Sequence, residues 1–406
     1  MRMMLRFEIK KVFSKSKNQL AVLIMLAVLA VTSILAINWV YYVDENGDNS
    51  TGITAVKHLR DMRNEWAGYL TEDVLKEALE INTQINNSEE AQSEDIQEQN
   101  KAFAKKQGIA DITDAISQAF SPYRGYDYYA VDRVSTEEIG NFYENRITAL
   151  KEWLDRGEEY YTEEQKDFLI DCYEELETPF YYEYHDGWDT LLQQISTFIL
   201  LLALIIGFLV SGIFSEEFQT RADSIFFSTK LGRTKGVLSK LGAGLAVITV
   251  FYGVFIFLYT FIVLLVLGAD GAGCPIQFSM WRSAYNVTFF QAYLLIVAGG
   301  YVGTLFASLL AMLVSALTRS AAAAAITPFI VLCALPFVSR IVSLPQIFAF
   351  FPDQFLQVYL DLKDPGLVQF GENVTTVANV IIPVYLAASV VLIPAVYAVY
   401  KKVQVK

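Results

Sequence analysis

The sequence has very few of the residues that carry out chemistry on substrates. It contains two histidines and three cysteines in 406 residues, and the histidines, His58 and His185, are far apart. It lacks the HExxH, CxxC and GxxxxGK[ST] patterns that mark metal and nucleotide-phosphate sites. These absences predict no catalytic, cofactor-binding or metal site within the chain. The energy for any mechanical work must then come from a separate protein.

Charge is also scarce, at 18% of residues, whereas 54% are hydrophobic. A soluble domain carries about 25% charged residues, and a membrane span needs roughly 20 apolar residues. Six segments meet that length, and they are 19–41, 191–214, three within 241–341 (241–267, 287–317 and 321–341), and 377–400. The sequence therefore predicts an α-helical polytopic membrane protein with six transmembrane helices.

Ionisable residues are almost absent from the centres of these spans. Ion-coupled transporters usually keep a carboxylate or a histidine near the middle of the membrane. The sequence therefore disfavours transport driven by protons or sodium.

Basic residues set the predicted orientation. Segment 1–18 contains six Lys and Arg residues against Glu8 alone, and the tail 401–406 is basic too. An excess of Lys and Arg marks the cytoplasmic side of a membrane protein. We therefore expect a plasma-membrane protein with both termini in the cytoplasm. On this topology Cys172 and Cys274 both lie outside, and whether they pair is left open.

Acidic residues are concentrated in the insertion between the first two spans. Segment 42–190 has a charge of about −22, which leaves about +9 for the rest of a chain whose net charge is −13. Such a negative surface excludes nucleic acid as a partner. The basic inner face suits anionic membrane lipids.

The insertion 42–190 is predicted to be a mainly helical extracytoplasmic domain. Helical periodicity runs through 58–81, and Ser135 with Glu138 and Thr162 with Gln165 have the spacing of capping boxes. Two tyrosine clusters have two interpretations, either domain core with a membrane-interface belt or a binding surface. Their members are Tyr123, Tyr126, Tyr128 and Tyr129, and then Tyr181, Tyr182 and Tyr184.

Two further patterns concern packing near and within the membrane. Segment 342–376 is amphipathic but interrupted by Pro352, which predicts a re-entrant or interfacial helix pair. In the fourth span small residues recur every fourth position, which predicts a tight helix seam within one subunit or between two. They are Gly299, Gly303, Ala307, Ala311 and Ser315.

The polar stretch between the second and third spans, 215–240, is the most informative part of the chain. It is longer than a simple turn, it is rich in charge, and its middle, 224–228, is apolar. An apolar patch framed by charges is typical of a surface that docks another protein. We therefore expect a partner to bind here, although a plain basic connector between spans is the simpler alternative.

The layout resembles the ABC-2 type permeases, the membrane subunits of ATP-driven exporters, and above all the bacterial multidrug and lantibiotic subgroup with a large outer insertion. The basic start is similar to the family's amphipathic elbow helix, with Arg2, Arg6, Lys10 and Lys11 on its polar side. The 215–240 loop is similar to the family's coupling loop. Its matching residues are the acidic start Glu216 and Glu217, the turn Gly232 and Arg233, and the closing Lys240. It departs at Arg221-Ala222, where the family pattern has Gly-Thr.

The resemblance implies that this loop docks on a cytoplasmic ATPase that binds ATP and Mg. Charged contacts would come from Glu216, Glu217, Arg221 and Arg233, and the apolar anchor from Ile225, Phe226 and Phe227. It also implies a second permease subunit, identical or different, and outward transport of a peptide, drug or lipid-like amphiphile. Two alternatives stay open: a non-transporting sensor or immunity component whose outer domain binds a peptide, and a membrane scaffold.

Overall fold

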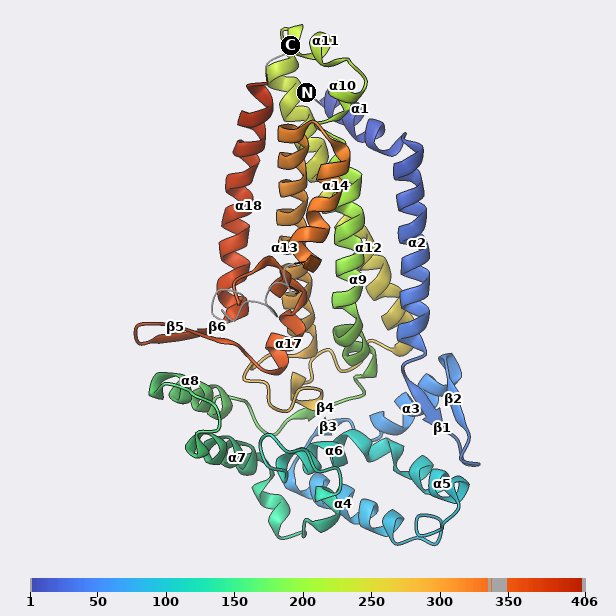
Figure 1. Cartoon of the computed structure of the whole chain (residues 1–406). Coiled ribbons are helices and arrows are strands. Elements are labelled where there is room, and N and C mark those ends of the chain that lie inside the picture. The colour runs from blue at the N-terminus through green and yellow to red at the C-terminus, as the bar shows by residue number, and fades with distance from the viewer. Residues whose placement is uncertain (1, 335–336, 338–348, 404–406) are drawn as a thin grey trace.

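The computed structural model describes residues 2–334, 337 and 349–403 of the chain. It has two parts (Figure 1): a bundle of long helices, and a domain of short helices that lies across one end of the bundle. The first and last described residues lie near each other at the opposite end. We call these ends of the bundle the domain end and the terminal end.

Five helices of the described chain are long and apolar enough to cross a membrane. A rise of 1.5 Å per residue makes the shortest, with 22 residues, about 33 Å long, enough to span a hydrocarbon core of about 30 Å. They are α2 (Ser16–Ile37), α9 (Asp186–Ser211), α12 (Val237–Leu267), α13 (Phe289–Thr318) and α18 (Val377–Lys401). The prediction of a multi-pass α-helical membrane protein is therefore confirmed.

The remaining predicted span, 321–341, lies only partly within the described residues. Its first part forms α14 (Ala321–Phe329), which begins at the terminal end, and a π-helical turn, η6 (Ile330–Ala334). Pro328 lies inside α14, and because proline has no backbone N–H it interrupts the regular hydrogen bonding just before the π-helical turn. The described segment that begins at residue 349 lies near the domain end (Figure 1).

Helices α9 and α13 form the centre of the bundle, and α2, α12, α14 and α18 surround them. Small residues let these helices approach closely. A side chain added at Gly207 of α9 would meet Pro328 at 2.3 Å, and one at Gly300 of α13 would meet Ile199 at 2.7 Å. The α9–α14 and α9–α13 contacts therefore depend on glycine.

The predicted small-residue seam of α13 is buried against elements of the same chain. Gly299 faces Val358, and Gly303 faces Phe355. Farther along, Ala307 and Ala311 are fully buried, and the Ser315 hydroxyl donates to the carbonyl of Ser211 at 2.6 Å. Within the described residues the seam therefore packs against η7 (Pro352–Leu356), α17 (Val358–Lys363) and α9.

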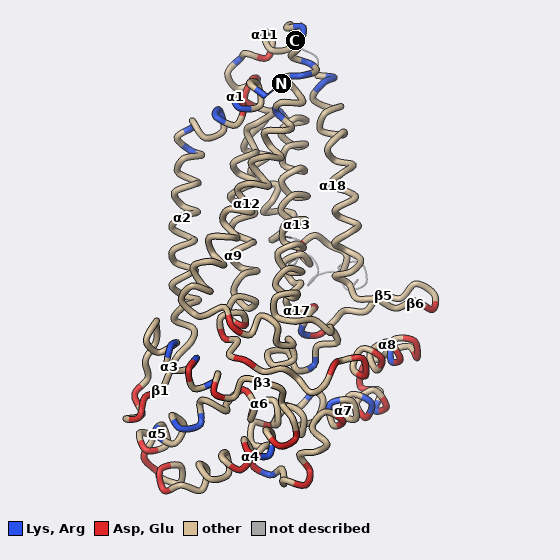
Figure 2. The backbone as a smooth tube through the Cα atoms, turned by 180° about the vertical axis from the view of Figure 1, so that it is seen from behind, with Lys and Arg blue, Asp and Glu red and all other residues tan. Residues whose placement is uncertain are grey.

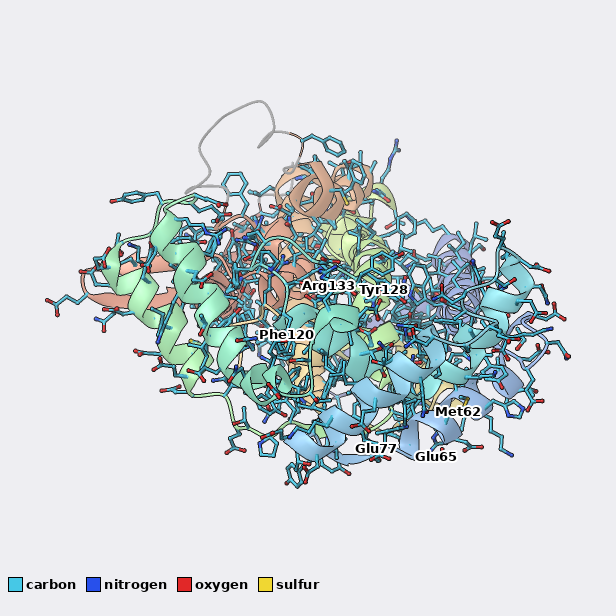
Figure 3. All side chains as sticks on the ribbon, turned by 90° about the horizontal axis from the view of Figure 1, so that it is seen from below. Met62, Glu65, Glu77, Phe120, Tyr128 and Arg133 are labelled. Carbon is cyan, nitrogen blue, oxygen red and sulfur yellow. The ribbon has the colours of Figure 1, made fainter. Side chains whose placement is uncertain are left out.

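The outer domain is mainly helical. Its helices are α3 (Ile53–Asn64), α4 (Glu72–Asn86), α5 (Ile96–Lys106), α6 (Ala110–Ala119), α7 (Phe142–Arg156) and α8 (Glu163–Glu174), with short 3-10 turns η1 (Gln107–Ile109), η2 (Ala130–Arg133) and η3 (Glu138–Asn141). Two small antiparallel pairs accompany them, β1 (Tyr41–Val43) with β2 (Asn49–Thr51), and β3 (Gly68–Tyr69) with β4 (Tyr181–Tyr182). Viewed from the domain end (Figure 3), these helices spread over the bundle.

The local predictions for this domain hold in part. Thr162 and Gln165 form the capping box that starts α8. Ser135 and Glu138 also bond each other, but α7 begins only at Phe142. The helical pattern of 58–81 is broken after residue 64, because strand β3 pairs there with β4 and anchors the end of the domain.

Each tyrosine cluster has both packed and exposed members. Tyr123 packs on a buried cluster, and Tyr181 is exposed. Tyr182 and Tyr184 are fully buried and belong to the packed core, as the first interpretation requires. Tyr126, Tyr128 and Tyr129 are exposed, and Tyr128 is visible on the outward face in Figure 3. The exposed group is therefore available for contact with another molecule.

A buried charge cluster joins the outer domain to the start of α9. The Arg63 guanidinium of α3 pairs with Asp186, the first residue of α9, and with Asp111 Oδ2 of α6 at 3.0 Å. Tyr182 donates a hydrogen bond to the same Asp111 oxygen at 2.9 Å. Since the three acidic and basic side chains are 12 to 18% exposed, this junction is held away from most solvent.

The segment predicted as a re-entrant helix pair differs from that prediction in its second half. Of its described residues, Pro352–Leu356 form a 3-10 turn (η7) and Val358–Lys363 a short helix (α17). Residues after them form an antiparallel hairpin, β5 (Leu367–Phe370) with β6 (Asn373–Thr376). Gly371 closes it at a φ of 66°, a left-handed conformation that glycine adopts without strain.

The pairing of Cys172 and Cys274, which the sequence left open, is not formed in the structure, where both are free cysteines.

Figure 2 shows acidic residues gathered in the outer domain and basic residues at the terminal end. The charge division predicted from the sequence thus corresponds to the two ends of the molecule.

The link between α12 and α13 contains a short 3-10 turn, η5 (Ile276–Phe278).

Candidate functional site at the terminal end

The candidate site is the segment between α9 and α12, which folds as a compact unit on the ends of the spans. It contains α10 (Glu216–Gln219), α11 (Asp223–Ser228) and the turn η4 (Gly232–Gly236), and α1 (Arg2–Phe13) lies beside it. Gly232 and Gly236 make the turn tight, since a side chain at Gly232 would lie 1.9 Å from the Phe226 carbonyl oxygen. We call residues 215–240 the coupling loop.

Glu217 is the centre of a buried ion-pair cluster. Its Oε1 lies 2.7 Å from Lys240 Nζ and 2.8 Å from Lys11 Nζ. Its Oε2 accepts a hydrogen bond from the Tyr400 hydroxyl at 3.1 Å. The side chains of Glu217 and Lys240 are 6% and 0% exposed. One carboxylate thus joins α10 to α1, α12 and the end of α18.

Neighbouring charges extend this cluster. Lys15 Nζ lies 2.7 Å from Glu216 Oε2, and Lys240 Nζ lies 3.2 Å from Glu8 Oε2. Lys240 also donates to the carbonyl of Ile213 at 3.0 Å. Buried charges are stable only when paired and hydrogen-bonded, and here every charge of the cluster has partners.

The surroundings of Glu217 keep its carboxyl ionised. Burial raises the pKa of this group, but Lys240 and Lys11 lower it more, so the pKa of Glu217 falls to about 2. Burial likewise lowers the pKa of Lys11, and its acidic neighbours more than offset that effect and raise it. Such a pair is suited to hold helices together and is unsuited to exchange protons near neutral pH.

This geometry changes the role predicted for several loop residues. Glu217 and Lys240 were expected to belong to a docking surface, but both are buried and paired inside the chain. Arg233 also turns inward, since its Nη1 donates to the carbonyls of Lys401 and Val403 at 2.9 and 2.8 Å. The sequence offers a partner protein as the simplest reason for charge in a loop. Here Glu216, Glu217 and Lys240 instead form ion pairs within the chain.

The predicted apolar anchor is likewise partly buried and partly exposed. Phe227 is 5% exposed and packs against Tyr400, with ring centroids 5.2 Å apart, and Phe226 contacts both rings. Ile225, in contrast, is 69% exposed, and Leu231 is 44% exposed. The outward apolar surface of the loop is therefore formed by Ile225 and Leu231.

The basic residues around this surface remain outside the ion-pair cluster. Arg221, Lys230 and Lys235 are exposed in the loop, and Arg2, Arg6 and Lys10 are exposed on α1. Lys11 is the one predicted elbow-helix residue that enters the cluster. An apolar pair framed by exposed basic residues favours a partner with an apolar groove and an acidic rim.

Sequence reasoning missed Lys15, Glu8 and Tyr400 as members of this site. Lys11 and Glu217 are separated by 206 positions, and Glu217 and Tyr400 by 183. No local spacing rule connects residues so far apart. The only available signal was their placement at the ends of predicted spans on the same side.

The fold and this site define a multi-pass, mainly helical membrane protein with a compact charged loop at one end of the bundle and a helical domain at the other. Within the described residues, no group of three or more His, Cys, Asp or Glu side chains is placed to hold a metal ion. No known protein family, no curated protein and no solved structure matches the chain.

Proposed function

We propose that the chain is the membrane-spanning permease subunit of an ATP-binding cassette exporter in a bacterial plasma membrane. Its termini and coupling loop face the cytoplasm, and a separate ATPase subunit binds the loop and holds ATP and Mg. The observation that carries the proposal is the loop itself. It is tied by Glu217 to three helical elements and still presents Ile225 and Leu231 outward.

The proposed mechanism transmits movement through the ion-pair cluster. Closure of the ATPase on ATP pushes the outward face of the loop. Because Glu217 is bonded to Lys11, Lys240 and Tyr400, the push reaches α1, α12 and α18 together, and α9 through the direct connection at Ile213. A loose loop would absorb this movement, whereas a loop bonded to the helix ends passes it on.

The rest of the assembly follows from the same proposal. Two permease subunits, identical or different, form the path, with six spans in each, and α1 lies on anionic lipid headgroups. The transported molecule is a peptide, a drug or a lipid-like amphiphile that moves outward. The acidic outer domain then covers the exit side.

A sensor or immunity component is the second candidate, and one observation favours it. The Arg63–Asp186 pair joins the outer domain directly to α9, so binding of a peptide to that domain can shift a membrane helix without transport. This candidate requires no ATPase, and neither does a membrane scaffold. Association with an ATPase therefore separates the first proposal from both alternatives.

The test is co-purification of the tagged full chain with the ATP-binding cassette subunit encoded beside it, followed by ATP turnover. Ile225→Asp combined with Leu231→Asp places charge on the outward surface and is expected to abolish both complex and stimulated turnover. Gln219→Asp adds charge at an exposed polar position of the same loop and is expected to leave both intact. A double variant that still binds and turns over ATP like the wild type refutes the proposal.

A further inference from the structure

A cavity of about 700 Å³ lies between the outer domain and the domain end of the bundle. Three separate parts of the chain line it: the end of α6 with the residues after it, the link between α12 and α13, and the segment from η7 to the start of α18. Its volume is within the range of pockets that hold small ligands, about 300–1,000 Å³. The cavity therefore stands where the domain meets the membrane helices.

The carboxylates of the cavity wall already have partners. Arg124 pairs with Asp364 at 2.8 Å and with Glu159 at 3.2 Å. Asp361 accepts hydrogen bonds from the Tyr285 hydroxyl at 2.5 Å and from the backbone N–H groups of Gly366 and Ala378 at 2.9 and 3.3 Å. Asp364 is thus ion-paired, and Asp361 is hydrogen-bonded without an ion pair among the described residues.

Two basic side chains in the wall have no acidic partner. Among the described residues, no Asp or Glu forms an ion pair with Arg282 or Lys363, and the sequence has no Asp or Glu between positions 335 and 348. Arg282 is half-buried and lies 5.7 Å from the ring centroid of Tyr123. The cavity wall thus has two cations without an ion-pair partner, Arg282 in the link between α12 and α13 and the exposed Lys363 of α17, and both lie beside the strongly acidic outer domain.

The outer domain itself, residues 42–190, pairs most of its cations. Of the 13 Lys and Arg residues in 42–190, all but Lys57, Lys106 and Arg146 form an ion pair with a carboxylate. Arg146 is satisfied by backbone carbonyls and Lys106 by the Asn86 side chain. Unpaired cations are therefore unusual in the outer domain, whereas the adjoining cavity wall has two, contributed by the link between α12 and α13 and by α17.

The remaining wall combines polar side chains, which are Gln118, Ser279, Gln354 and Gln357, with apolar and aromatic ones. Met280, Trp281, Leu360 and Val377 line it together with Tyr126. The Val377 end of the cavity is the first turn of α18, where a membrane span begins. A ligand that fits this wall needs an anionic group for Arg282 and Lys363 and a hydrocarbon part for the apolar and aromatic side chains.

We propose that this cavity binds an anionic amphiphile, a molecule with a phosphate or carboxylate head and an apolar tail. As a binding site it stands on the cavity wall alone. As the place where a transported molecule leaves the bundle it rests on the proposed export function, and it narrows that substrate to anionic, lipid-like molecules. The head contacts Arg282 and Lys363, and the tail lies against Trp281 and its apolar neighbours.

The test measures binding to the purified full chain in an uncharged detergent. The probe is dihexanoyl phosphatidic acid, compared with dihexanoyl phosphatidylcholine, which has the same tails and a neutral head, and with inorganic phosphate. Calorimetry gives the affinity, and fluorescence of Trp281 reports the place, with Trp281→Phe as the check that the signal comes from the cavity. We expect saturable binding of phosphatidic acid that is tighter than binding of either comparison molecule.

Arg282→Gln with Lys363→Gln is expected to weaken phosphatidic acid at least about tenfold, because two charge-assisted contacts are lost. Lys57→Gln with Lys105→Gln removes the same charge from the outer domain away from the cavity and should leave the affinity unchanged. Equal binding of inorganic phosphate or of phosphatidylcholine, or wild-type affinity of the cavity variant, overturns the proposal. Because no ATPase is present, this result and the co-purification result can fail independently.

Discussion

Lys240 Nζ lies 2.7 Å from Glu217 Oε1, with Lys240 fully buried and Glu217 nearly so. The two residues come from α12 and α10. Their pairing turns the coupling loop into part of the bundle. The stability of the terminal end should therefore depend on both members.

Replacing Glu217 with Gln should destabilise the protein by about 3 kcal/mol, because the fully buried Lys240 ammonium then keeps one carboxylate, that of Glu8 at 3.2 Å, and loses its closer partner. Thermal unfolding of the purified protein in detergent measures the effect. Lys15→Gln, which breaks the more exposed Lys15–Glu216 pair, should cost less than about 1 kcal/mol. Equal losses for the two variants would show that burial of the Glu217 cluster contributes little.

The stability contributed by Glu217 should depend on pH only in the acid range. Its pKa is lowered from 4.5 to about 2, so the folded state holds the ionised carboxylate more strongly than the unfolded state does. The contribution is present in full above pH 4.5 and is lost as pH falls towards 2. Unfolding of wild type and Glu217→Gln compared across this range should converge at low pH, and a constant difference would contradict this assignment.

Arg221 adopts a φ of 55°, the left-handed conformation that costs a residue with a side chain about 1 kcal/mol or more. Arg221→Gly should therefore stabilise the loop by about 1 kcal/mol. Gln219→Gly, in the helical conformation of α10, should have the opposite sign. Loop stability can be followed by hydrogen exchange of the 215–240 amides, and protection that falls in both variants would refute the strain.

Gly207 should tolerate no side chain. A methyl group there would approach Pro328 at 2.3 Å, so Gly207→Ala must push α14 away from α9 and should cost about 1–3 kcal/mol. Gly253 of α12 has nothing within 4 Å, and Gly253→Ala should be neutral or mildly stabilising. The comparison of unfolding temperatures tests the contact, and equal temperatures for both variants would mean that the α9–α14 spacing is not fixed.

Long-range features separate what the sequence could predict from what it could not. The spans were predictable because each is a continuous apolar run, and Thr162 with Gln165 because a capping box is complete within four residues. The ion-pair cluster was not, since its members are brought together only by the packing of α1, α10, α12 and α18. The expected docking surface consequently included residues that the fold has buried.

The hairpin β5–β6 was missed for a different reason. The interpretation of 342–376 relied on amphipathic periodicity in 347–362, interrupted by Pro352, and carried it past the end of α17. Gly371 between two short segments rich in Val, Phe and Thr is a turn signal of the kind that predicts a hairpin. At position 221 the family pattern has glycine, whereas this chain has Arg221. The backbone there is left-handed, a conformation that suits glycine, and the sequence alone could not reveal it.

Helix α9 connects the two ends of the molecule as one rigid rod. Its 26 residues make it about 39 Å long. At its start Asp186 is bound to Arg63 of the outer domain, and just beyond its end Ile213 accepts from Lys240 and Glu217 anchors the coupling loop. If a partner ATPase pushes the loop as proposed, a small tilt of α9 there becomes a lever movement at α3, and the outer domain swings with it.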